Sequence, residues 1–162
     1  MAYQKLQAGL AVDVIPSDTI NIPVPNVVVS DTTGLSITTN KLIDSDVDFI
    51  ELNVKIGDTV YNTSTTGIAK VVQVEDANTL VLSANIFQSA SQDYIIYSSA
   101  DHPNQGCVLY VGDTTGGNDL SVVTSSGSEV IFKGLVAGSF IPVQVVRVKS
   151  TRTTVSSVLA LW

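Results

Sequence analysis

The residues best suited to chemistry are three alternating carboxylates, Asp44, Asp46 and Asp48. Carboxylate oxygens at this spacing can converge on a hard cation such as Ca²⁺. A calcium-binding loop of the EF-hand type that began at Asp44 would need Gly at its sixth position and Glu at its twelfth. The chain has Phe49 and Lys55 there instead. The pattern therefore predicts a solvated acidic loop, and we expect no metal site and no cofactor.

The single histidine and the single cysteine offer little for catalysis. His102 precedes Pro103 in a polar junction, and although serines are plentiful, the chain has no Gly-x-Ser-x-Gly nucleophile elbow. Cys107 lies in the apolar run Cys107–Val111, where a buried, inert thiol is expected. One cysteine excludes an intramolecular disulfide, and one residue of each kind gives no zinc-ligand cluster. We interpret His102 as a connector residue and expect no catalytic residue and no enzyme.

A glycine-containing stretch, Gly112–Asn118, separates two strand-like runs at 106–111 and 120–124. It includes Gly116-Gly117, but no Gly-Lys-Ser/Thr follows to complete a phosphate-binding loop. The stretch therefore predicts a mobile hairpin loop rather than a phosphate cradle.

Composition favours an ordered protein built from strands. Hydrophobic residues make up 44% of the 162 positions and charged residues only 14%, which suits a core-forming chain. Val and Ile, whose Cβ is branched, fit a pleated surface, and no stretch repeats apolar residues at helical spacing. The start of the chain does not resemble a secretory signal, and no apolar run approaches the ~18 residues that span a bilayer. We expect a soluble, all-β protein with no membrane partner.

Charge is unevenly distributed along the chain, whose net charge is −7. Residues 27–104 carry ten acids against three lysines. Residues 105–162 carry three acids against four basic residues, which are Lys133, Arg147, Lys149 and Arg152. This asymmetry predicts two modules. The excess of acid opposes phosphate binding, and no basic patch is interleaved with aromatic residues, so we expect no nucleic-acid partner.

The middle of the chain contains short strand-like runs joined by turns. The runs are 55–62, 67–74, 79–82 and 94–97, with a turn at 75–78 and a bend at Gly57-Asp58. The sequence also allows one helical turn over 85–92. Four or five short strands joined in this way predict a small β-barrel of the SH3 or OB kind.

The ends of the chain also predict strands. These lie at 8–15, 106–111, 120–124, 129–133, 140–149 and 158–162. In 140–149 the alternation changes phase after Ile141, Val143 and Val145, which predicts a bulge near Val145. Residues 20–26 contain two prolines and are expected to be an edge strand or a connector. The apolar end Val158–Trp162 must be buried, in its own core or against a neighbour.

Several blocks of the sequence resemble one family, the head spike base proteins of phage and gene-transfer-agent particles. The matching blocks are Pro16–Pro23, with the sequence PSDTINIP, Leu109–Gly112, with the sequence LYVG, Val130–Val145 and the ending Thr153–Trp162. Members of that family are similar in a Pro-Ser-Asp-Thr element, in a Leu-Tyr-Val-Gly element a few residues later, and in a terminus that ends Ala-Leu-Trp. Here about eighty residues separate the first two blocks, and they coincide with the acidic stretch.

The resemblance implies a discontinuous β-sandwich of the jelly-roll type, formed by residues 1–26 and 105–162. Residues 27–104 would be a small acidic β-barrel inserted at a surface turn. The family also implies a structural protein of the virion, made in the host cytoplasm, that acts as a capsid-associated spike base or decoration protein. Its partners would be further copies of the chain, in a pentamer or trimer, together with capsid and fibre proteins.

Two other functions stay open at this point. A tail, neck or adhesin component would use its barrel to contact a host-surface glycan. An enzyme that acts on polysaccharide would need two carboxylates held in a cleft. The acids Asp44, Asp46, Asp48 and Glu51 lie in one local run, which favours the structural, non-catalytic interpretation.

Overall fold

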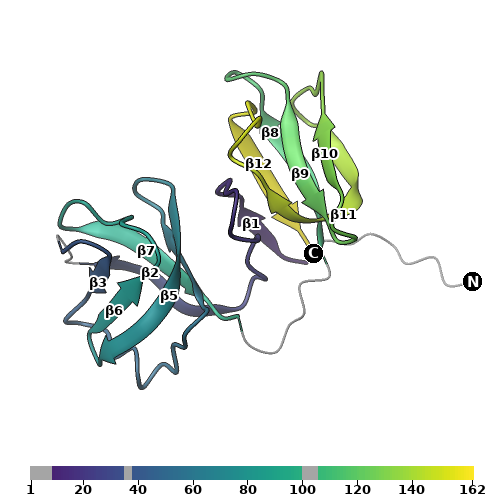
Figure 1. Ribbon diagram of the computed structural model, residues 1–162. Helices are drawn as coiled ribbons and strands as arrows, with labels where there is room; N and C mark the ends of the chain where they lie inside the picture. Colours follow the sequence, from purple (N-terminus) through teal and green to yellow (C-terminus); the bar gives the residue numbers. More distant parts are fainter. Residues whose placement is uncertain (1–8, 35–37, 100–105) are drawn as a thin grey trace, which may run out of the picture. The chain divides into compact units, whose positions relative to one another are not determined.

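Residues 9–34, 38–99 and 106–162 are described by the structure, a computed structural model of the chain (Figure 1). Over these ranges the chain is all-β, as the sequence predicts, with twelve strands and no helix. None of the described segments is a helix long and apolar enough to cross a membrane. The chain divides into two compact units: unit 1 comprises Met1–Pro25 and Asn104–Trp162, and unit 2 comprises Asn26–Pro103. Each unit contains one six-stranded antiparallel sheet.

Unit 1 is built on a sheet with the strand order β1-β12-β8-β11-β9-β10. Its strands are β1 (Ala11–Asp13), β8 (Cys107–Asp113), β9 (Leu120–Thr124), β10 (Glu129–Phe132), β11 (Phe140–Val148) and β12 (Ser157–Leu161). The first and last strands of the chain are neighbours, because Ala11 pairs with Leu161 and Asp13 with Leu159. The sheet is therefore formed by two segments that are far apart in the sequence (Figure 1).

The core of unit 1 comes from residues that alternate along its strands, which is the period of a sheet with one buried face. Leu109 and Val111 of β8 and Ala160 of β12 are all 0% exposed and belong to one hydrophobic cluster. Leu161 and Trp162 are half-buried, and Trp162 packs against that cluster. The C-terminus is thus covered within unit 1, although less completely than its apolar sequence suggests.

A bulge interrupts β11, as the sequence predicts. Ile141 pairs with Leu109 and Val145 pairs with Cys107, so four steps along β11 match two steps along β8. Ile141 and Val145 are buried, but Val143 is exposed, so the prediction that Val143 shares their face is wrong. The extra residues of a bulge bend the strand and rotate the intervening side chains away from the core.

The prediction of a hairpin over Gly112–Asn118 is also wrong. Strand β8 pairs with β12 and β11, and β11 lies between β8 and β9. The stretch therefore connects two strands that are not neighbours in the sheet. A local sequence signal cannot reveal this, because β11 enters the gap from about twenty residues further along the chain.

Unit 2 is built on a sheet with the strand order β2-β7-β4-β5-β6-β3. Its strands are β2 (Val27–Gly34), β3 (Lys41–Ile43), β4 (Thr59–Asn62), β5 (Gly67–Asp76), β6 (Thr79–Leu82) and β7 (Gln92–Tyr97). The long strand β5 pairs with β4 through Gly67–Lys70 and with β6 beyond Val71, with register shifts in its second half. The sheet is open, because β2 and β3 form its two edges.

The two ends of unit 2 lie side by side. Val27, the first residue of β2, pairs with Tyr97, the last residue of β7. Next to this pair, the Ser98 amide donates a 2.8 Å hydrogen bond to the Asn26 carbonyl oxygen. Unit 2 therefore begins and ends at one place, which is the geometry that an inserted module needs.

Residues 85–92 form no helical turn. The side-chain oxygen of Gln92, which is 5% exposed, accepts hydrogen bonds from the amides of Gln88 at 3.0 Å and Ser89 at 3.3 Å. These amides are bound to a side chain rather than to backbone carbonyls one turn earlier. The buried glutamine thus replaces the helical hydrogen bonds that the sequence allowed.

The first testable prediction concerns the C-terminal strand. Deleting Leu161 and Trp162 removes the pairing with Ala11 and the three backbone hydrogen bonds that join Trp162 to Gly9 and Leu10. The loss of half-buried apolar surface should lower the free energy of unfolding of unit 1 by about 2 kcal/mol. Amide hydrogen exchange should show faster exchange in β1 and β12. The amides of β4–β7 in unit 2 serve as the internal control, and unchanged protection of β1 would contradict the prediction.

Candidate functional site

The acidic run is occupied by hydrogen bonds within the protein. The Asp44 carboxylate is 1% exposed and accepts hydrogen bonds from the Tyr94 hydroxyl at 2.8 Å and the Asp46 amide at 3.0 Å. Burial, and then the bond to Asp44, raise the pKa of Tyr94 far above its ordinary value. Asp48 accepts hydrogen bonds from two amides of the following turn, at 2.9 Å each. Among the described residues, no group of three or more His, Cys, Asp or Glu is arranged to hold a metal ion.

The other candidates from the sequence are one histidine and one cysteine. His102 lies outside the described residues. Cys107 is 1% exposed and lies in the core of unit 1, as its apolar neighbours predict, with its thiol 3.2 Å from the Val145 carbonyl oxygen. Burial raises the pKa of Cys107 to about 12, so the thiol is protonated at neutral pH.

The glycine stretch packs against the segment that precedes β12. The Gly116 amide donates to the Ser156 hydroxyl at 2.7 Å, and the Asp119 amide donates to the Thr154 hydroxyl at 3.0 Å. A Cβ on Gly116 would lie 2.8 Å from the Thr154 carbonyl oxygen, so this position has no room for a side chain. The loop amides are therefore engaged by Thr154 and Ser156 rather than open to a phosphate.

Asp18 binds the turn between β11 and β12. Its carboxylate accepts hydrogen bonds from the Ser150 hydroxyl at 2.8 Å, the Thr151 hydroxyl at 2.7 Å and the Thr151 amide at 3.0 Å. These bonds, those of Thr151 first, lower the pKa of Asp18. Arg147 reaches the same segment, donating to the Asp18 carbonyl oxygen and the Asn21 side chain at 2.9 Å each. We call this set of contacts the Asp18 clamp.

The segment after Asp18 is a connector rather than an edge strand. Ile22 is buried in the core of unit 1, and its amide donates a 2.9 Å hydrogen bond to the Val146 carbonyl oxygen. The Ser17 amide bonds the Val148 carbonyl oxygen at the same distance. Residues 17–22 therefore run along β11 with two direct backbone contacts, and the prolines that follow need no ladder partner.

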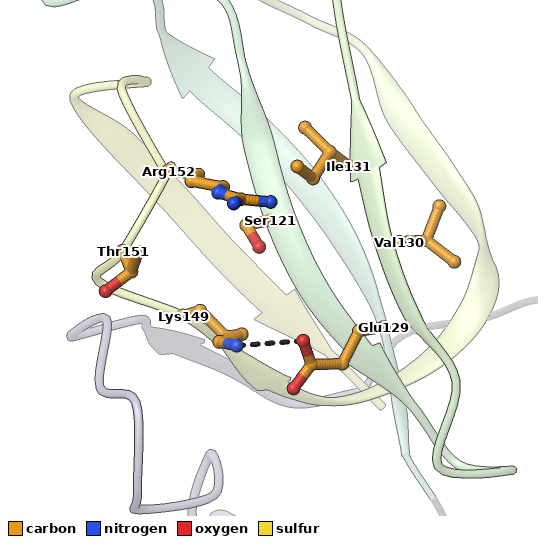
Figure 2. Close-up of a pocket in the computed structure, with 7 residues that line it drawn as sticks. All are labelled: Ser121, Glu129, Val130, Ile131, Lys149, Thr151 and Arg152. Atoms are coloured by element: carbon orange, nitrogen blue, oxygen red, sulfur yellow. Dashed lines mark hydrogen bonds and ion pairs between the residues drawn. The ribbon is translucent and has the colours of Figure 1, made fainter.

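A pocket of about 320 Å³ includes Thr151, a residue of the Asp18 clamp, in its lining. Strands β9 and β10 and the turn after β11 line it, with Ser121, Glu129, Val130, Ile131, Lys149, Thr151 and Arg152. Ser121 and Ile131 are a cross-strand pair. Lys149 and Glu129 form an ion pair of 2.9 Å across the pocket wall (Figure 2). The pocket thus combines charged, hydroxyl and apolar side chains.

The electrostatics of the pocket are dominated by Arg152. Lys149 is neutralised by Glu129, whereas the guanidinium of Arg152 has no hydrogen bond or ion pair with any described residue. The backbone of Arg152 has φ 69°, in the left-handed region that an arginine rarely adopts. The sequence pointed to an excess of basic residues here, but it did not indicate Ser121 or Glu129, which reach the pocket through strand pairing.

Comparison with protein-family models, with curated proteins and with solved structures gives no significant match to this chain.

The Asp18 clamp makes a prediction about pH. Because the folded-state pKa of Asp18 is lowered, its contribution to stability is present at neutral pH and is lost as the pH falls through the lowered pKa. Asp18→Asn should remove this part of the acid dependence of unfolding. In an NMR titration, Thr151→Val should raise the pKa of Asp18.

A matched control lies in the glycine stretch. Thr115 donates to Asp113 as Thr151 donates to Asp18, and these bonds lower the pKa of Asp113. Thr115→Val should raise the pKa of Asp113 and leave that of Asp18 unchanged. An Asp18 titration that is insensitive to Thr151→Val would show that the clamp does not form in solution.

Proposed function

We propose that this chain is a structural protein of a tailed-phage virion, a capsid-associated spike base or decoration protein that assembles through protein–protein contacts. The observation that supports this most directly is the location of the family-like blocks. Residues 17–22, within the first block, run along β11, Leu109–Gly112 belong to β8, and Val158–Leu161 lie in β12, which pairs with β8. Blocks that are separated by about eighty residues in the sequence thus belong to one unit.

The proposal includes a finer description of the two units. Unit 1 would be a jelly-roll-like sandwich, because β11 bends at its bulge and the sheet wraps a single hydrophobic cluster. Unit 2 would be an inserted, partly open barrel of the SH3 or OB kind, in which the two edge strands β2 and β3 do not pair with each other. Its long strand β5 serves both halves of the sheet, and one cluster receives residues from both halves, such as Leu42 and Ile96.

Unit 1 offers the surface for self-association. Phe140 is 57% exposed and packs against Tyr110 with ring centroids 5.2 Å apart, and the nearby Val136 is also exposed. Residues 105–162 carry nearly balanced charge, whereas residues 27–104 carry ten acids against three lysines. Acidic surfaces repel one another when copies meet, so unit 1 would form the pentamer or trimer and unit 2 would remain available to a capsid or fibre protein.

A tail or adhesin component that binds a host-surface glycan is the second candidate, and the pocket in unit 1 favours it.

A polysaccharide-cleaving enzyme has less support. Such an enzyme needs carboxylates that face a substrate across a cleft. Asp44 is instead buried against Tyr94, and Asp48 is bound to backbone amides.

The virion assignment predicts that the protein is a fixed component of purified particles. Quantitative mass spectrometry should find it at a constant ratio to the major capsid protein through successive rounds of density-gradient purification. A structural protein keeps this ratio because it is bound in the shell or tail. Loss of the protein to a sub-stoichiometric trace would contradict the assignment.

The assembly surface can be tested on the full chain with two matched substitutions. Phe140→Asp places a charge on the exposed aromatic residue of unit 1, and Ile56→Asp does the same at a 69% exposed position of unit 2. Native mass spectrometry should show a smaller subunit number for Phe140→Asp and the parental number for Ile56→Asp. Both positions are exposed, so neither substitution should unfold the protein. The opposite pattern would assign the contact to unit 2.

A further inference from the structure

The pocket of unit 1 contains a cation that suits a carboxylate ligand. Arg152 lines the pocket and has no partner among the described residues, while Lys149 is paired with Glu129. A guanidinium presents several N–H donors in a planar fork, which matches the two oxygens of a carboxylate. The lining residues therefore carry two positive charges, on Lys149 and Arg152, against one negative charge on Glu129, with the Asp18 carboxylate behind the Thr151 turn.

A second polar group in the pocket wall is the hydroxyl of Ser121. Ser121 is only 4% exposed, and its hydroxyl, which no described residue binds, points between Arg152 and Lys149 in Figure 2. The hydroxyl oxygen is not among the fully buried polar atoms that lack a hydrogen-bond partner, so it is open to the pocket and accessible to a ligand. A ligand oxygen between Ser121 and Arg152 would bind both groups at once.

The backbone at Arg152 shows that this arrangement has a cost. A non-glycine residue at φ 69° is strained, and glycine would adopt that conformation freely. The turn is held in place from the other side, since the neighbouring Thr151 is bound to Asp18 through both its amide and its hydroxyl. The guanidinium is thus positioned over the pocket by a turn that the Asp18 clamp fixes.

The remaining lining groups specify the class of ligand. Glu129 can accept hydrogen bonds from hydroxyls, and Ile131, the cross-strand partner of Ser121, offers an apolar wall to the C–H face of a ring. A volume of about 320 Å³ is at the small end of ligand pockets and suits one sugar ring. Phosphate or sulfate would use Arg152 but neither the acceptor nor the apolar wall. We propose that the pocket binds one acidic monosaccharide unit, a uronic acid, with its carboxylate on Arg152 and Ser121.

The proposed uronic-acid site does not rest on the virion assignment, so an experiment that rejects one of these proposals leaves the other standing. The experiment uses the full chain, titrated with sodium glucuronate, with glucose as the neutral ring of the same shape, and with acetate and inorganic phosphate as plain anions. Glucuronate should shift the NMR signals of Ser121, Ile131 and Arg152 and bind more tightly than any of the other three. Equal binding of acetate or phosphate would reduce the pocket to a general anion site and overturn the proposal. So would tighter binding of a Glu-rich peptide, or no binding at all.

Three variants assign the binding to the pocket. Arg152→Gly should weaken glucuronate binding by about tenfold or more, because it removes a charged hydrogen-bonding group, yet keep or raise the melting temperature by relieving the strained φ. Ser121→Ala should weaken binding several-fold without loss of stability. Lys133→Ala removes one positive charge from an exposed position of unit 1 outside the pocket and should leave binding unchanged. Parental affinity in Arg152→Gly, or equal losses in Lys133→Ala and Arg152→Gly, would overturn the proposal.

Discussion

The pairing of β1 with β12 is the interaction on which the rest of unit 1 depends, because it joins the two segments of that unit, between which the chain inserts unit 2, about eighty residues from Asn26 to Pro103. Closing a flexible loop of that length costs about 4 kcal/mol. Part of this cost is removed by unit 2 itself, whose ends meet at the Val27–Tyr97 pair and the Asn26–Ser98 hydrogen bond. Once unit 2 has folded, the effective loop is much shorter. The insertion is therefore compatible with a stable unit 1.

Hydroxyl and carboxamide side chains hold the loops of a protein with few charges. Charged residues make up 14% of the chain, and the sequence has one cysteine. The loops are fixed instead by side chains that bind backbone amides, such as Gln92 in unit 2 and Thr154 in unit 1. A hydrogen bond of this kind contributes about 1 kcal/mol. This explains how a chain rich in Ser and Thr forms long connections without helices in its described part.

Strands with strong local signals were predicted from the sequence, whereas their neighbours in the sheet were not. The runs 79–82 and 120–124 agree with β6 and β9 at both ends. Strands β2 and β3 were missed, because β2 mixes valines with polar residues and β3 has only three residues. The connection after β8 was misread as a hairpin for a different reason. Strand order is set by long-range pairing and by which faces must be buried, and neither appears in a local pattern.

The pocket shows the same limit at the level of a site. The basic residues near the C-terminus are visible in the sequence, but the pocket also needs Ser121, which reaches it through its pairing with Ile131. It needs the turn at Thr151 as well, and that turn is bound by Asp18, a residue more than 130 positions earlier. Thr151 therefore links the clamp to the pocket: if Asp18 releases it, Lys149 and Arg152 lose the backbone that orients them. The three hydrogen bonds of the Asp18 carboxylate thus contribute both to the stability of the discontinuous unit and to the geometry of its pocket.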